Sequence, residues 1–175
     1  MLIRAVFALG LAATLPAQVM GSINTDAPTV RAAIEFANGA EIELSYTAVR
    51  FGSGEWLGAL ADAERQAAFN ARAEQRPIGE VKTTRSLIVA GNVVPASTYD
   101  LYFTVEGDDG WKVNLRRQGD PDAVAIFWRL HPKGEGPAAP RLQLGLTAGA
   151  EATAAVFLLA FGERWARVPF VVQGE

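Results

Sequence analysis

Apolar and polar residues alternate along several short stretches of this chain, and a period of two indicates half-buried β-strands. In residues 41–48 the apolar residues Ile42, Leu44 and Tyr46 alternate with polar ones. The preceding residues 29–36 are a second candidate strand, and Asn38-Gly39 between the two runs favours a hairpin because both residues readily adopt positive φ. The chain therefore opens with a predicted β-hairpin.

Residues 80–117 predict three consecutive strands of a β-meander, the stretch around which the rest of the chain is organised. The first strand contains residues 87–89 and ends at a glycine turn. Residues 99–105 then alternate, residues 107–110 read Gly-Asp-Asp-Gly, which favours a tight turn, and residues 111–116 alternate again.

Four more strands are predicted in the C-terminal third, at residues 123–130, 141–147, 152–161 and 165–172. Pro169 lies within the last of them and indicates a sheet edge or a bulge, because proline donates no ladder hydrogen bond. The total of about nine short strands separated by turns predicts an all-β fold, an antiparallel β-sandwich.

One segment differs in composition from the rest. Residues 59–76 are rich in Ala, Glu, Arg and Gln, which are good helix formers. Asp62 is suited to cap this Ala-rich helix and Pro77 to stop it. Because most of its apolar residues are alanines, the helix is expected over an edge or an end of the sheets rather than in the core.

The N-terminus has the layout of a secretory signal peptide. One Arg precedes an apolar run at residues 5–15, followed by Pro16 and small residues. The run is shorter than the about 20 residues that span a bilayer. We therefore expect residues 1–21 to be a signal peptide, residues 22–175 to be a single domain without a transmembrane segment, and the protein to be periplasmic or secreted.

Composition narrows the possible partners and cofactors. The net charge is −3 and no basic run is present, so nucleic acid is not expected as a partner. The chain has no cysteine, which excludes disulfides and thiolate metal sites. No metal site and no cofactor are predicted.

Parts of the chain resemble a family of exported bacterial proteins catalogued as domain of unknown function 2911. The resemblance lies in residues 31–60, in EVKTTRSLIVAGNVVPASTYDLYFTVEGDDGWKVNL and in the final RWARVPFVV. The W-R-x-G-A-N-x-A-T segment usual in that family is missing here. The resemblance implies export and a β-sandwich, and it implies no activity.

Candidate chemistry is sparse. His131 is the only histidine, and beside Pro132 it is interpreted as a solvated turn residue, so no catalytic residue is predicted. Among the four tryptophans, Trp56 is the best candidate for an exposed aromatic, because it lies in a Gly-rich loop next to Glu55.

Arg85 and Arg116 would add a modest cationic patch if they shared a solvent face. The predicted binding residues are therefore Trp56, Glu55, Arg85 and Arg116. They suit a small molecule, a sugar or a protein partner.

The sequence favours an exported, non-catalytic binding or envelope-associated module. Two alternatives stay open. One is a hydrolase-type enzyme with a site near the Gly-rich loop, the helix and His131. The other is a structural partner in an envelope assembly. The sequence does not define the ligand or the oligomeric state.

Overall fold

The computed structural model describes residues 26–51, 62–107, 110–120, 122–130 and 138–174. These residues form one helix and eleven strands, rather than the about nine expected from turn spacing. In chain order the elements are β1 (Thr29–Glu35), β2 (Glu41–Thr47), α2 (Ala63–Gln75), β3 (Gly79–Thr83), β4 (Leu87–Val89), β5 (Asn92–Val94), β6 (Ser97–Glu106), β7 (Gly110–Arg117), β8 (Ile126–Leu130), β9 (Ala139–Ala148), β10 (Ala154–Gly162) and β11 (Arg164–Val172).

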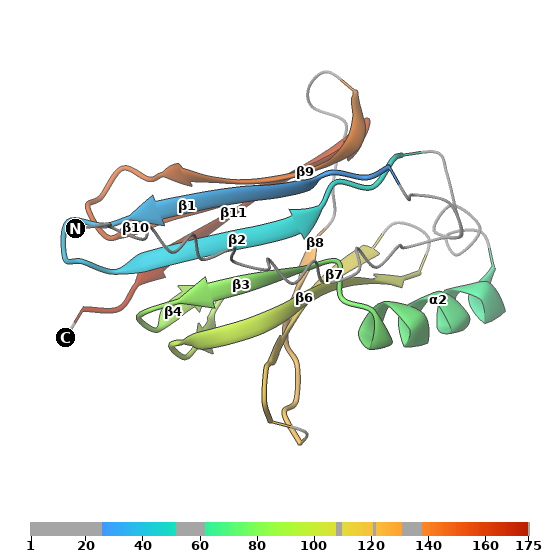
Figure 1. The fold of residues 1–175 in the computed structure, drawn as a ribbon, viewed down its shortest axis with the longest axis horizontal. Coiled ribbons are helices and arrows are strands. Elements are labelled where there is room, and N and C mark those ends of the chain that lie inside the picture. Colours follow the sequence, from blue (N-terminus) through green and yellow to red (C-terminus); the bar gives the residue numbers. More distant parts are fainter. Residues whose placement is uncertain (1–25, 52–61, 108–109, 121, 131–137, 175) are drawn as a thin grey trace, which may run out of the picture.

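Two antiparallel sheets pack face to face, which confirms the predicted β-sandwich (Figure 1). One sheet has six strands in the order β1-β2-β3-β6-β7-β8, and the other has five in the order β5-β4-β11-β10-β9. The core lies between them. Leu44, Leu101, Val113 and Leu159 are among its fully buried side chains.

The alternating pattern of the sequence explains which residues enter this core. On β2 the side chains of Ile42, Leu44 and Tyr46 are buried, as predicted. The hairpin before them turns at Asn38-Gly39, where Gly39 has φ of 75° and the Phe36 N–H donates to the Ala40 carbonyl at 2.8 Å. The opening hairpin is therefore confirmed.

The predicted three-stranded meander at residues 80–117 is wrong in its first strand. Residues 87–89 form β4, which belongs to the other sheet and pairs with β5 and β11. On the side away from β7, the strand that pairs with β6 is β3. The tight Ala90-Gly91 turn, with φ of 46° and 80°, folds β4 back on β5 instead of leading into β6. The meander of this sheet is β6-β7-β8, and β8 begins at Ile126 rather than at residue 123.

Pro169 lies in an interior strand but at a local edge. β11 has β10 on one side along its whole length, whereas β4 pairs only with residues 170–172 on the other side. In an antiparallel ladder the residues facing one neighbour alternate with those facing the other. Position 169 faces the β4 side, beyond the end of β4, so the missing proline N–H costs no ladder hydrogen bond.

Helix α2 begins and lies as its composition predicts. The Asp62 carboxylate accepts from the backbone N–H groups of Glu64 and Arg65, which caps the first turn. Phe69 and Ala73 are its buried residues, and the helix lies beyond one end of the sheets, beside β6 (Figure 1). Within the described residues, no helix is both long and apolar enough to span a membrane.

Candidate functional site

The free edge of β6 defines one side of the candidate site. β3 pairs only with residues 97–101 of β6, so β6 continues alone toward Glu106 on that side. Leu101 faces β3, and in an antiparallel ladder every second residue faces the same way. The backbone N–H and C=O groups of Phe103 and Val105 therefore point away from β7, to the side where β3 has ended.

Helix α2 takes the place of a neighbouring strand at Val105. The Asn70 Nδ2–H donates to the Val105 carbonyl at 2.9 Å, and the Val105 N–H donates to Asn70 Oδ1 at 2.8 Å. One turn earlier, Gln66 Nε2–H donates to the Gly107 carbonyl at 3.1 Å. The carboxamide of Asn70 thus pairs with β6 as a peptide group of a strand would, which protects part of the exposed edge.

Phe103 lies between the two partners that cover this edge. On one side, the Ile78 N–H donates to the Leu101 carbonyl at 2.9 Å; on the other, Asn70 covers Val105. Among the described residues, no group forms a hydrogen bond with the backbone N–H or C=O of Phe103. Within the described part of the chain, a donor and an acceptor therefore stand side by side without a partner.

A cavity of about 30 Å³ opens at this point, between α2, the β6 edge and the end of the sandwich. We call it the end cavity. The described residues of its wall are mostly apolar and aromatic, and they are Val49, Arg50, Phe69, Ile78, Phe103, Thr104, Val105, Trp111, Leu142 and Phe161. Apolar walls with a few convergent polar groups are typical of small-molecule sites.

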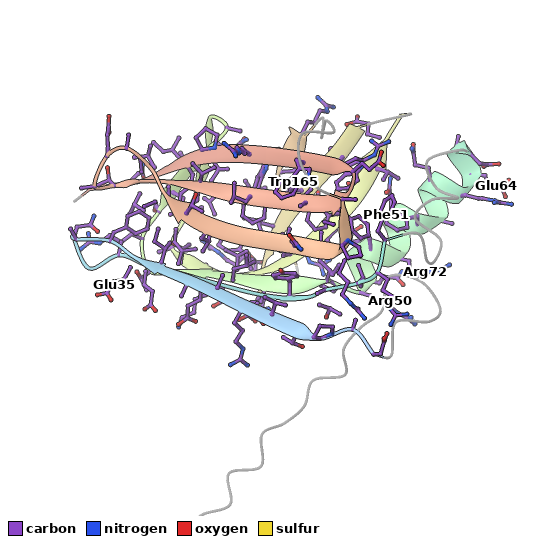
Figure 2. The ribbon with its side chains drawn as sticks, turned by 90° about the horizontal axis from the view of Figure 1, so that it is seen from above. Glu35, Arg50, Phe51, Glu64, Arg72 and Trp165 are labelled. Atoms are coloured by element: carbon purple, nitrogen blue, oxygen red, sulfur yellow. The ribbon has the colours of Figure 1, made fainter. Side chains whose placement is uncertain are left out.

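The rim of the end cavity joins the two sheets. The Phe51 N–H donates to the Pro140 carbonyl at 2.9 Å, and the Phe51 ring meets the Phe161 ring edge-on, with centroids 5.1 Å apart. Arg50, which lines the cavity, forms an ion pair with Asp26. Figure 2 shows Arg50 and Phe51 at the helix end of the sandwich, with Glu35 at the opposite end.

A second cavity of about 30 Å³ lies in the core, and we call it the inner cavity. Its wall, which includes Val81, Leu101, Trp128 and Phe157, is formed by hydrophobic side chains of both sheets. Trp128 Nε1 is buried and has no hydrogen-bond partner among the described residues. The described wall of the inner cavity is hydrophobic throughout, whereas that of the end cavity also includes Arg50 and Thr104.

The outer face of the six-stranded sheet carries a polar network that includes one predicted site residue, Arg116. Its guanidinium contacts Asp100 at 3.4 Å and Glu74 at 3.6 Å. It also lies over the ring of Tyr102, and burial of this phenol raises its pKa. Arg116 is therefore held by carboxylates of β6 and α2.

The structure does not bring Arg85 and Arg116 together into a cationic patch. Arg116 pairs across the sheet with Asp100, which in turn pairs with Glu80 near the start of β3. Arg85 comes after the other end of β3. Trp56 and Glu55 lie outside the described residues, as does His131.

Two residues near the end cavity were not singled out from the sequence. Phe103 lines the cavity, and Asn70 covers the β6 edge beside it. The available signal was a difference in length: the alternation at 99–105 continues further than the short strand before it, so part of its edge lacks a strand neighbour. The one asparagine in the Ala-rich helix was the residue able to cover that edge.

Within the described residues, no group of three or more His, Cys, Asp or Glu side chains is arranged to hold a metal ion. A comparison of the chain with protein-family models, curated proteins and solved structures finds no match. The resemblance to the domain of unknown function 2911 family therefore stays a prediction.

Proposed function

We propose that this protein is an exported, non-catalytic binding module that holds an apolar group of its ligand in the end cavity. The observation that carries the proposal is the end cavity itself. It is a space between α2 and the β6 edge with an apolar wall, and the N–H and C=O of Phe103 beside it have no partner among the residues that the structure describes. Sites of this composition bind by burying apolar surface and orient the ligand through the few polar groups present.

The groups that face the end cavity suit binding. Phe69, Ile78, Leu142 and Phe161 offer only dispersion and desolvation. Arg50 adds a charge at the rim, where it shares the Asp26 carboxylate with Arg141. Each buried methylene contributes about 0.8 kcal/mol. A group of two or three carbons therefore gains roughly 2 kcal/mol, and isolated fragments should bind in the millimolar range or more weakly.

Paired variants that fill each cavity test the site. Val49→Ile adds a methylene to the wall of the end cavity, and Val81→Ile adds one to the wall of the inner cavity. Fragment binding measured by ligand-observed NMR should weaken at least about threefold in Val49→Ile, the loss expected for roughly one methylene of excluded space, and stay unchanged in Val81→Ile. Equal binding to both variants would place the site elsewhere.

Export rests on the signal-peptide layout of residues 1–21. Mass spectrometry of the protein from its native cell should find an N-terminus near Gln18 or Ser22. An intact Met1 in a cytosolic fraction would contradict export without affecting the proposed binding site.

A further inference from the structure

The edge of β6 already recognises one carboxamide. Asn70 pairs with the N–H and the C=O of Val105 through a single amide group, at 2.8 and 2.9 Å. A primary amide can do this because it presents an acceptor oxygen and a donor N–H side by side. The structure thus contains a working example of how this edge binds an amide.

Phe103 offers the same pair of groups two residues earlier on the strand. Its N–H and C=O face the same side as those of Val105, because alternate residues of an antiparallel strand share an edge. In contrast to Val105, the Phe103 pair has no partner among the described residues, and Phe103 lines the end cavity. Buried backbone groups are nearly always paired with protein, water or ligand.

We propose that the end cavity recognises a carboxamide attached to a short aliphatic group, with the amide bound to Phe103 as Asn70 is bound to Val105. The ligand oxygen accepts from the Phe103 N–H, and the ligand N–H donates to the Phe103 carbonyl. The aliphatic part contacts Phe69, Ile78 and Leu142. This inference rests on the proposed function and specifies the chemical class of the ligand.

The size of the end cavity limits what enters it. A cavity holds one water molecule when about 10–15 Å³ is open to a water-sized sphere, and the end cavity has about 30 Å³ of such space. The amide and the first carbons of its aliphatic group therefore fit without movement of the wall, and the remainder of a longer ligand lies toward the rim at Arg50. Side-chain amides and amidated termini of peptides have this form.

The test is a titration of the ¹⁵N-labelled mature chain with acetamide, acetone and acetate, in which the Phe103 amide resonance is followed by NMR. Acetone can accept from the Phe103 N–H but has no N–H to donate, and acetate is charged and has no donor. We expect acetamide to shift the Phe103 resonance and to bind about fivefold more tightly than acetone, the effect of one further net hydrogen bond. Acetate should leave the Phe103 resonance in place.

Val49→Ile narrows the end cavity without changing Phe103, and Val81→Ile in the inner cavity is its matched control. The acetamide shift should shrink in Val49→Ile and persist in Val81→Ile. Equal affinity for acetamide and acetone, or an acetate shift as large as that of acetamide, would overturn the inference.

A water-filled cavity gives a different result, which also overturns the inference: no probe shifts the Phe103 resonance at any concentration tested. Xenon is then added under pressure to separate the two proposals. Shifts of the resonances of Ile78 and Leu142 with xenon alone would leave the proposed function standing. The absence of any shift with xenon or with the three small molecules would remove both proposals.

Discussion

Replacement of Asn70 with leucine tests whether α2 acts as a substitute strand on β6. Leucine keeps nearly the same shape and removes both hydrogen bonds with Val105, which measure 2.8 and 2.9 Å. Each lost bond is worth about 1 kcal/mol net, and an N–H or C=O left without a partner costs up to about 1–3 kcal/mol where it is buried. Because Asn70 is only partly buried, water offsets some of this penalty, and we expect a loss of about 2–3 kcal/mol.

Urea denaturation of the wild type and the variant measures this loss, and hydrogen exchange locates it at the Val105 amide. Gln66→Leu is the control, since it removes a single exposed hydrogen bond and should cost under about 1 kcal/mol. A cost below about 0.5 kcal/mol for Asn70→Leu, with Val105 still protected from exchange, would refute the view that the Asn70 amide closes the edge.

Asn70→Asp separates the two halves of the same interaction. A carboxylate still accepts from the Val105 N–H, but it faces the Val105 carbonyl with a lone pair instead of a donor. We expect this contact to raise the carboxyl pKa in the folded state, because protonation restores a donor for the Val105 carbonyl. Stability is then greatest below the unfolded pKa of about 3.9 and falls as pH rises through the folded pKa. The variant should lie closer to the wild type at pH 4 than at pH 7, and a loss that does not depend on pH would contradict the assignment.

Three further outcomes are expected. Gly162→Ala, where φ is 62° and a Cβ would lie 2.5 Å from the Phe51 ring, should cost more than Gly39→Ala, where φ is 75° and the space is open; equal urea midpoints would show that the Phe51 contact does not matter. Burial raises the pKa of Tyr46 above 10.0. The contribution of Tyr46 to stability is therefore complete below about pH 10 and falls as pH rises through the folded pKa. Tyr46→Phe should reduce this alkaline loss of stability in melts at pH 9 and pH 11. Trp111→Ala should cost about 3–5 kcal/mol, because its side chain is buried in the core, and a loss under 1 kcal/mol in denaturant melts would contradict this position.

Local periodicity predicts much of this fold because each half-buried strand must alternate. The β2 pattern and the faces of β7 follow directly, since Trp111, Val113 and Leu115 are buried while Lys112 and Arg116 lie on the outer face. Asn114 is the exception. It is buried on the outer face, where its Nδ2 donates to the Thr104 hydroxyl at 3.1 Å.

The assignment of strands to sheets was less accessible, because pairing depends on contacts between distant residues. The apolar sequence of residues 87–89 is equally compatible with a strand of the meander and with a strand of the second sheet. Their partner on one side is β11, about 80 residues later in the chain, and no local pattern reports that distance. The short Ala90-Gly91 turn was visible in the sequence, but it marks a hairpin without naming its sheet.

The candidate site was less predictable still. Sequence reasoning selected aromatic and charged side chains, whereas the end cavity depends on a backbone amide and on where β3 stops. Phe103 occupies an apolar position of the alternating pattern, as other core residues do. Only the three-dimensional register shows that its N–H and C=O lie beyond the end of β3, between Ile78 on one side and Asn70 on the other.

Crystals of the protein held under xenon pressure show whether the end cavity takes up apolar groups, because xenon binds in preformed apolar cavities that it can reach. We expect a xenon atom in the end cavity, in contact with Phe69, Leu142 and Phe161, and none there in Val49→Ile. Xenon found only in the inner cavity beside Trp128, or in neither cavity, would contradict the claim that the end cavity is a binding site for apolar groups.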